Sequence, residues 1–574
     1  LLVSAGGWAW GGSQLWAFRF FLYIPWPWRL LMALAILLSA YAPLTAAIAR
    51  LRYPVFRDAI AHRAFDSLLI LLSGLCFWLW QERTWRGDAL LKVKLLAEQT
   101  LQSDPYVWKE PLDSLLAYST TALARRFALP PESAVAGWSI VAGMLYVWAL
   151  LYAARFLADR DGRRLRLVGA LLALGSTQLW FGHIENYGLV TACSFVTLVW
   201  ALGYLRGVNR LWPVGLAAGL AVCFHPQAIF VMPALLWLPR RPAWWRQLAT
   251  LAATALLGPL ITLALMAAQG VPWPSLSGGY AGDSKLFLTL GEALAPAHLW
   301  DVANTVWLVA PLAPLWLVIG IWALRLRTVR RDRCFQLLSV ATAGLLAYLL
   351  FFQNDLPRPR DWDLFAIVGP GLTLWGWYAW EKWLAPSGVL RAERVATAWP
   401  ALLFAAFFAT GWIGVNHTLT LIHPNSDERA VYARYRLLDL LTLLPTAQVT
   451  PPEPICAEAV GCERVAATSF TMPQNGDTRP VLFAHAPSRI VLPLPVLTDR
   501  TFLWLSPMLD PASWGWGGDG VTFQVSVEQE GAEQVLWTHH YTPADFTATG
   551  WQEVFVSLAP FRGQRVDLVL TTAP

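Results

Sequence analysis

The chain has 574 residues, of which 56% are hydrophobic and 14% charged, and its mean hydropathy is +0.45. These values exclude a soluble globular protein and predict a protein of the lipid bilayer. The net charge of +6 does not indicate a nucleic-acid partner, because the arginines are spread over short loops and form no basic stripe.

Apolar runs long enough to cross about 30 Å of hydrocarbon recur along the first two thirds of the chain. They are residues 28–49, 64–81, 136–157, 166–182, 187–205, 246–268, 303–324, 334–352, 364–381 and 396–414. A further stretch, 211–238, is interrupted at "FHPQ", where Pro226 removes a backbone donor, so two half-helices are predicted. The pattern predicts an α-helical polytopic membrane domain over 28–414 with twelve membrane helices, preceded by an interfacial segment at 1–27.

The loops between these runs indicate the orientation, because Lys and Arg in short loops mark the cytoplasmic side. With twelve helices, the basic loops all fall on one side; they are residues 50–63, 159–166, 206–210, 239–246, 325–333 and 381–394. The opposite side then holds the external loop 82–135, "FGHIENYG" at 181–188, the loop 269–302 and "QNDLPRPRDWD" from residue 353. Acids and histidines from distant parts of the sequence are therefore expected together on the extracytoplasmic face of the plasma membrane.

The external loop 82–135 contains Asp88 shortly after a predicted membrane helix and directly before "ALLKVKLL". A carboxylate at this place can accept a proton from an attacking hydroxyl or amine, which is general-base chemistry. Alternatively, Asp88 caps the helix that follows, a common role of Asp.

The turn "FGHIENYG" joins two predicted membrane helices with almost no loop, so its polar residues are expected at the membrane surface. Four polar groups there are costly unless they bind something. Glu185 is a candidate second catalytic carboxylate or metal ligand, and His183, Asn186 and Tyr187 are candidate substrate-binding residues. The alternative is a solvated turn in which Tyr187 anchors the chain at the interface.

The segment "QNDLPRPRDWDLFA" at 353–366 concentrates charge between two apolar runs. Arg358 and Arg360 offer planar guanidinium groups suited to phosphate oxygens. Asp361 and Asp363 can orient these arginines, bind sugar hydroxyls or, with Glu185, ligate a divalent cation. A charge-rich turn with no ligand is the alternative.

Further candidate binding residues lie in the loop 269–302 and at the break in 211–238. Lys285 and His298 are candidates for neutralising a phosphate, and His298, Asp301 and Asn304 follow a helical spacing that places them roughly on one face. Asp301 can equally favour the dipole of a helix N-terminus. His225 is a candidate substrate-binding residue at the broken hairpin, or a side chain that satisfies a freed backbone group.

The loop with Asp88, the "ENY" turn and "RDWDLFA" resemble features of a bacterial branch of the GT-C superfamily of membrane glycosyltransferases, over residues 64 to 414. The resemblance implies an inverting transfer of a sugar from a polyprenyl-phosphate-type donor to a glycan, lipid or protein acceptor outside the membrane, with Asp88 as the loop acid. Because the "WWD" motif of metal-dependent oligosaccharyltransferases is missing, the resemblance implies no certain cofactor and leaves a divalent cation open.

A non-catalytic membrane protein is the alternative function, either a transporter or flippase of lipid-linked saccharides or a structural subunit of a larger membrane assembly. A transporter is expected to carry ionisable groups near the middle of the bilayer. The centres of the predicted helices are almost free of charge, which favours the enzyme.

The composition changes after residue 414. Residues 415–479 read as a connector and proline-rich linker, and residues 480–574 alternate in the manner of strands and predict an extracytoplasmic β-sandwich. This part resembles jelly-roll carbohydrate-binding domains, with Trp514, Trp516 and Trp551 either as sugar-stacking platforms or as core residues. Cys456 and Cys462 are the candidate disulfide pair.

Overall fold

The computed structural model describes most of the chain and divides it into two compact units, Leu1–Val415 and Asn416–Pro574. The described residues are 15–39, 41, 59–82, 89–104, 106–127, 129–158, 161–240, 242–273, 286–353, 361–384, 391–418, 420–422, 438–454, 463–471, 478–497, 501–515, 517–549, 551–552 and 554–574.

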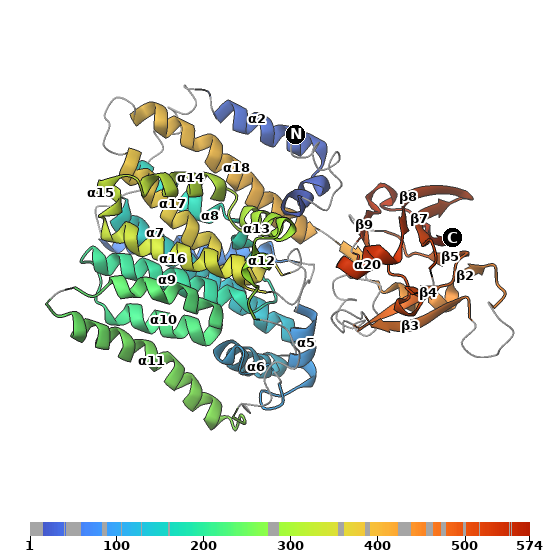
Figure 1. Cartoon of the computed structure of the whole chain (residues 1–574), viewed down its shortest axis with the longest axis horizontal. Coiled ribbons are helices and arrows are strands. Elements are labelled where there is room, and N and C mark those ends of the chain that lie inside the picture. Colours follow the sequence, from blue (N-terminus) through green and yellow to red (C-terminus); the bar gives the residue numbers. More distant parts are fainter. Residues whose placement is uncertain are drawn as a thin grey trace. The chain divides into compact units, whose positions relative to one another are not determined.

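The first unit is helical (Figure 1). Its α-helices and 3₁₀ helices (η) are η1 Trp16–Tyr23, α2 Trp26–Ser39, α4 Ala59–Leu79, α5 Ala89–Glu98, α6 Pro111–Arg126, α7 Pro131–Leu157, α8 Asp161–Leu172, η2 Gly175–Trp180, α9 Tyr187–Leu205, α10 Trp212–Phe224, η3 Pro226–Trp237, α11 Trp244–Ala268, α12 Leu290–Ala293, α13 Pro296–Val309, α14 Ala313–Ala323, α15 Arg327–Arg330, α16 Arg333–Phe351, η4 Asp363–Phe365, α17 Val368–Leu384 and α18 Arg391–Thr418.

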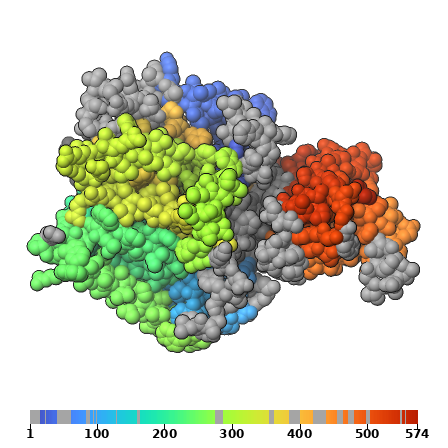
Figure 2. Space-filling model, viewed as in Figure 1, coloured from blue at the N-terminus to red at the C-terminus, as the bar shows by residue number. Residues whose placement is uncertain are grey.

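Five helical stretches among the described residues are long and apolar enough to cross a membrane, namely α7, α9, α11, α16 and Trp399–Thr418 of α18. The pair α13 and α14 makes a sixth when it is counted as one span. Figures 1 and 2 place α11 at the outer edge of the helical unit, and its Leu256, Leu260 and Ile261 are exposed, as expected of a surface that faces lipid. The chain is a helical membrane protein; the count of twelve spans stays a prediction.

Two predicted spans differ from the observed helices. The stretch 166–182 is not one helix: α8 ends at Leu172 and the shorter η2 follows, where a Cβ added to Gly175 would lie 1.6 Å from the Leu308 carbonyl oxygen. The stretch 303–324 is bent by 100° between α13 and α14, with Pro311 and Pro314 at the break. The apolar pattern did not reveal these breaks, because close backbone approach at Gly175 and the paired prolines act on the backbone within an apolar run.

The predicted break in 211–238 is present. Helix α10 ends at Phe224, His225 has extended backbone angles (φ −162°, ψ 139°), and η3 begins at Pro226. Proline is well suited to the first position of a helix because it has no N–H group to leave unpaired there.

Helices α9 and α17 run from an acid- and histidine-rich end to a basic end. Helix α9 begins directly after the turn that contains His183 and is followed by Arg206, whose Nη2 donates to Tyr378 Oη of α17 at 2.9 Å. Near the same end, Tyr378 Oη donates to Asp332 Oδ2 at 3.0 Å and Lys382 pairs with that carboxylate at 3.1 Å. The basic residues and the turn with His183 therefore lie at opposite ends of these helices, as the loop charges predicted.

Helices α10 and α11 approach each other closely through glycines. A Cβ added to Gly219 of α10 would lie 2.0 Å from the Ala255 carbonyl oxygen, and one added to Gly258 of α11 would lie 2.9 Å from the backbone of Gly219. Small residues allow this contact, which is typical of helix pairs in membranes.

We expect Gly219→Ala to destabilise the helical unit, because the added methyl group must push α10 away from α11. Overpacking of this kind costs about 1–3 kcal/mol. The measurement is the midpoint of thermal unfolding of the purified protein in detergent. The matched control is Gly137→Ala in α7, where no atom lies within 4 Å of the added Cβ. Equal midpoints for the two variants would contradict the close packing of α10 on α11.

The second unit is a β-sandwich. Its strands are β1 Thr420–Ile422, β2 Gln448–Thr450, β3 Val465–Thr471, β4 Thr478–Ala484, β5 Ser488–Pro493, β6 Thr501–Leu505, β7 Val521–Gln529, β8 Ala532–Tyr541, β9 Val554–Ser557 and β10 Asp567–Ala573. It also contains η5 Leu440–Thr446, η6 Pro511–Ser513, α20 Pro543–Thr549 and η7 Ala559–Phe561. A five-stranded sheet has the order β2-β5-β10-β7-β8, a three-stranded sheet has the order β1-β6-β9, and β3 pairs with β4.

Both larger sheets contribute to one core. Ile490 and Leu568 from the five-stranded sheet pack with Leu503 and Val556 from the three-stranded sheet. Leu440 of η5 joins this core. The unit therefore uses residues that the sequence assigned to the connector 415–479, including strands β1, β2 and β3.

Two of the candidate sugar-stacking tryptophans pack inside the second unit. Trp514 stacks on Phe546 with ring centroids 6.3 Å apart, and Trp551 is 8% exposed with the Arg479 guanidinium 5.0 Å above its ring. Core packing explains both positions. Trp516, Cys456 and Cys462 lie outside the described residues.

Candidate active site

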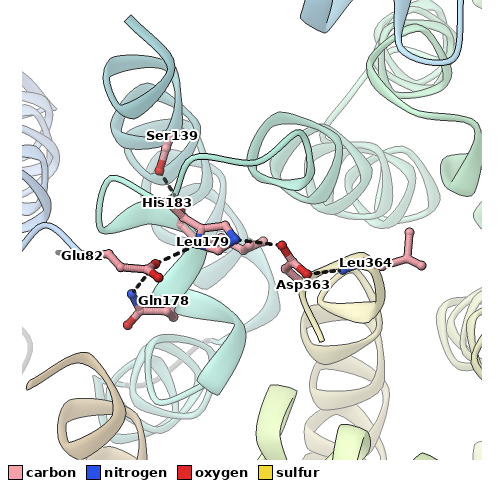
Figure 3. A network of polar contacts seen from close by, with 7 residues as sticks. All are labelled: Glu82, Ser139, Gln178, Leu179, His183, Asp363 and Leu364. Atoms are coloured by element: carbon pink, nitrogen blue, oxygen red, sulfur yellow. Dashed lines mark hydrogen bonds and ion pairs between the residues drawn. The ribbon is translucent and has the colours of Figure 1, made fainter. Parts of the chain in front are cut away.

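Three segments that are far apart in the sequence meet beside the N-terminal ends of α9 and α17 (Figure 3). They are the end of α4 with Glu82, the turn 181–186 between η2 and α9, and the turn 361–365 before α17. The Glu82 backbone N–H donates to the Phe181 carbonyl at 2.7 Å, which ties the first segment to the second. Gly182 has φ +71°, a conformation that glycine adopts without strain.

His183 lies at the centre of this site and bridges two carboxylates. Its Nδ1 is 2.7 Å from Glu82 Oε2 and its Nε2 is 2.8 Å from Asp363 Oδ2. All three side chains are buried, with exposed fractions between 3% and 6%. Figure 3 shows the imidazole lying between the two acids.

The charge of His183 follows from its neighbours. Burial alone lowers the pKa of His183, but the Glu82 and Asp363 carboxylates outweigh burial and hold that pKa well above its ordinary value. The imidazole is therefore positively charged at neutral pH and donates a hydrogen bond to each acid. A buried acid is stabilised by such a partner, whereas an uncompensated one is costly.

Neighbouring side chains fix the three bridged residues. Gln178 Nε2 donates to Glu82 Oε2 at 3.2 Å, and Asp363 Oδ1 accepts the Leu364 backbone N–H at 3.2 Å. Ser139 of α7 donates to the Leu179 carbonyl, which holds the segment before the turn. The ring of Trp362 lies 5.6 Å from the His183 ring. These contacts leave the site with a defined geometry.

Glu185 lies next to this bridge and also faces a small pocket. His183, Glu185 and Asp363 each offer one atom that could bind a metal ion, and these three atoms lie within 4.8 Å of one another. The pocket is lined by Glu185, Asp113, Ser139, Trp138, Ala117, Val135, Gly188 and Leu189. Its lining therefore includes the Glu185 and Asp113 carboxylates and the Trp138 indole.

Asp113 reaches the pocket from α6 and pairs with Lys92 of α5. Lys92 Nζ lies 2.5 Å from Asp113 Oδ2. Burial raises the pKa of Asp113, and Lys92 only partly offsets this rise. Arg125 of α6 donates to the Leu96 carbonyl at 2.6 Å, a second bond between α5 and α6.

His225 and Tyr187 lie together at one side of the site. Their rings are 5.4 Å apart, and His225 Nδ1 accepts the Gln227 backbone N–H at 3.2 Å. The Glu110 carboxylate is 3.7 Å from His225 Nε2, too far for a hydrogen bond. Burial, followed by Lys109 and Lys92, lowers the pKa of His225 to about 3, so this imidazole is neutral at pH 7.

The structure uses His298, Asp301 and Asn304 to hold other parts of the chain. His298 Nε2 donates to the Leu350 carbonyl at 2.8 Å. Asp301 Oδ1 accepts the Trp16 indole N–H at 3.0 Å, and Asn304 Oδ1 accepts the Ala17 N–H at 3.2 Å. Asp301 and Asn304 therefore fasten η1 to α13, a role that the helical spacing did not reveal.

Of the other predicted site residues, the structure describes Asp361 and Asn186. Asp361 is 8% exposed and directly precedes Trp362. Asn186 directly precedes α9, and its side-chain oxygen is buried with no hydrogen-bond partner among the described residues. Asp88, Lys285, Arg358 and Arg360 lie outside the described residues, so their roles stay predictions.

Sequence reasoning missed Glu82, Gln178 and Asp113. Glu82 is the first acid after the predicted helix 64–81, so its place at the end of an apolar run was a usable signal. Gln178 lies within an apolar stretch, and a polar side chain in such a place is a functional candidate. Asp113 gave no distinguishing local signal, because its neighbour Lys92 is 21 residues away.

Comparison with known proteins gives distant structural likenesses. No family model and no curated protein matches the sequence. Structures of ArnT from Cupriavidus metallidurans are similar in the apo state (13% identity, 62% of this chain, 77% of that chain, TM-score 0.42) and bound to undecaprenyl phosphate (12%, 74%, 98%, 0.43). Arabinosyltransferase EmbB from Mycobacterium smegmatis is similar over 94% of this chain and 66% of that chain (11% identity, TM-score 0.31).

Because every TM-score is below 0.5, the function has to be inferred from the site and the sequence.

Proposed function

We propose that the chain is an inverting GT-C-type glycosyltransferase that moves a sugar from a polyprenyl-phosphate-type donor to an acceptor on the extracytoplasmic face of the plasma membrane. The observation that supports this most is the gathering of Glu82, His183, Glu185 and Asp363 beside a pocket at the end of the bundle opposite Arg206 and Lys382. An acid-rich pocket at a helix end suits chemistry on a lipid-anchored substrate.

The reaction is a single displacement. A hydroxyl or amine of the acceptor forms a bond to the anomeric carbon, the bond from that carbon to the donor phosphate oxygen breaks, and polyprenyl phosphate leaves with the electron pair. The acceptor's proton goes to a carboxylate. Glu185 is the best candidate among the described residues, because it lines the pocket while Glu82 and Asp363 hold His183. Asp88 is the candidate that the sequence resemblance implies.

The donor phosphate needs a cationic partner at the same end. Arg360 directly precedes Asp361 and lies three residues before Asp363 in the sequence. A guanidinium group can hold two phosphate oxygens at once. We therefore assign phosphate binding to Arg358 and Arg360, as the sequence predicts.

We expect Arg360→Ala to weaken binding of polyprenyl phosphate (55 carbons) about tenfold or more, because a hydrogen bond to a charged group contributes about 1.5–3 kcal/mol. Native mass spectrometry of the purified protein measures the bound lipid, with polyprenol of the same length as the phosphate-free comparison. Arg327→Ala, an exposed arginine near the basic end, is the matched control. Equal binding of phosphate and alcohol, or equal loss in both variants, would contradict a phosphate site at Arg360.

A further inference from the structure

The arrangement of His183, Glu185 and Asp363 has the composition and spacing of a metal-ion site. Their ligand atoms lie within 4.8 Å of one another. Ligands about 2.0–2.2 Å from a shared cation are separated by about 3 Å when adjacent and at most about 4.4 Å when opposite. His183 Nε2 and Asp363 Oδ2, at 2.8 Å, are already close to the spacing of adjacent ligands, and a small movement of the Glu185 side chain is enough to complete the set.

We propose that His183, Glu185 and Asp363 bind one divalent transition-metal cation, with Glu82 as the carboxylate that orients the imidazole. Nε2 is the ligand atom of His183 because it faces Asp363 at 2.8 Å, while Nδ1 faces Glu82 at 2.7 Å. The ion takes the place of the hydrogen between Nε2 and the Asp363 carboxylate.

The surroundings of His183 match those of metal-bound histidines. Such histidines commonly donate their second N–H to a carboxylate, which fixes the tautomer and the direction of the ring. Glu82 accepts from Nδ1 and is itself held by the Gln178 amide at 3.2 Å. The site therefore has an inner set of ligands and an outer set that orients them.

The burial and charge of the cluster favour a dication. His183, Glu185 and Asp363 are 5%, 8% and 2% exposed. Glu185 and Asp363 bring two carboxylates to one imidazole at a buried place, and buried charged groups are commonly paired or coordinate a metal ion. A dication can be held at the point where these ligand atoms converge.

The ligand chemistry selects the class of ion. Imidazole suits zinc and other transition metals, and carboxylates suit manganese as well. Magnesium and calcium prefer all-oxygen sites. We therefore assign Zn²⁺ or Mn²⁺ rather than Mg²⁺ or Ca²⁺. Because a carboxylate has two oxygens, Glu185 can bind the ion with one and face the pocket with the other.

The test is ion binding by the full-length protein in detergent after treatment with a chelator. Calorimetric titration with Zn²⁺ and Mn²⁺ is expected to give one ion per chain for at least one of them, with Mg²⁺ and Ca²⁺ binding at least about 100-fold more weakly. Elemental analysis of the loaded protein checks the stoichiometry. If neither Zn²⁺ nor Mn²⁺ forms a one-to-one complex, the assignment is overturned, whether or not the protein transfers sugar.

Variants locate the site. Asp363→Asn and His183→Gln are expected to weaken the one-to-one binding at least 100-fold, and Glu82→Gln, which touches no ion, about 10- to 100-fold. His540→Gln, at an exposed histidine of the second unit, is the control for surface binding and is expected to leave the affinity unchanged. Loss of binding in the His540 variant alone would contradict the proposal.

A spectroscopic measurement adds a readout that does not depend on the affinity for the ion. The unaltered protein loaded with Co²⁺ is expected to show visible absorption bands that change in the Glu82→Gln variant, because the imidazole is reoriented. Identical bands in the two proteins would contradict the proposal that Glu82 orients the His183 imidazole at the ion.

Discussion

Glu185→Gln is expected to reduce the rate of glycosyl transfer by about 10²- to 10⁴-fold, the usual contribution of a general base. The amide keeps the size of the side chain but cannot accept the proton of the acceptor. The measurement follows labelled sugar from the lipid-linked to the acceptor-linked fraction in membrane vesicles from cells that produce the chain. Polyprenyl phosphate binding is expected to stay within a factor of two or three, because the proposal gives Glu185 the acceptor's proton and assigns the donor phosphate to Arg358 and Arg360.

The same transfer assay includes a control variant and a variant of the competing general base, Asp88. Glu530→Gln changes an exposed acid in the second unit and is expected to leave transfer unchanged. Asp88→Asn tests the loop acid that the sequence resemblance implies. If Asp88→Asn abolishes transfer while Glu185→Gln does not, the base is Asp88 and the assignment of Glu185 is wrong. Undiminished transfer in both variants would refute carboxylate catalysis at this site.

His183→Phe is expected to produce the largest loss of stability in the helical unit. The substitution leaves the Glu82 and Asp363 carboxylates buried without their shared cation, and removing one partner of a buried ion pair costs about 3–5 kcal/mol. The free energy of unfolding is measured by titration with sodium dodecyl sulfate in mixed micelles, with a chelator present so that bound ions do not contribute. His298→Phe, which removes a bond to the uncharged Leu350 carbonyl, is expected to cost less.

A double-mutant cycle separates the bridge from simple loss of packing. Glu82→Gln removes one of the two charges that His183 compensates. If His183 and Glu82 stabilise each other, the double variant His183→Phe, Glu82→Gln loses less free energy of unfolding than the two single variants lose together. The expected difference is about 0.5–3 kcal/mol. Additive losses would mean that the two side chains do not stabilise each other, and the central contact of the site would have to be abandoned.

Several parts of the site were predictable because their signals are local. His183, Glu185 and Asp363 stand out as polar residues between apolar runs, and such positions are costly without a function. The half-helices on either side of His225 follow from Pro226, whose missing N–H group acts on its own segment. A reading of the sequence needs no knowledge of distant contacts for either feature.

Other parts depended on which segments approach each other. His298, Asp301 and Asn304 have the spacing of one helix face, but whether that face binds a ligand or η1 is decided by the fold, which brings Trp16 to Asp301. Glu82 was passed over for Asp88 because both acids follow the same helix and only tertiary contacts show that Glu82 reaches His183.

The sequence by itself determined that this chain is a helical membrane protein with a β-sandwich after it, because hydrophobicity and its period act residue by residue along the chain. It also determined that histidine and acids gather at one end of the helices, since charge in short loops sets the orientation. Only the tertiary structure decided the bridge Glu82–His183–Asp363, the Lys92–Asp113 pair at the pocket and the bend between α13 and α14. Partners of buried polar groups are chosen by the approach of distant backbones, and no local pattern encodes that choice.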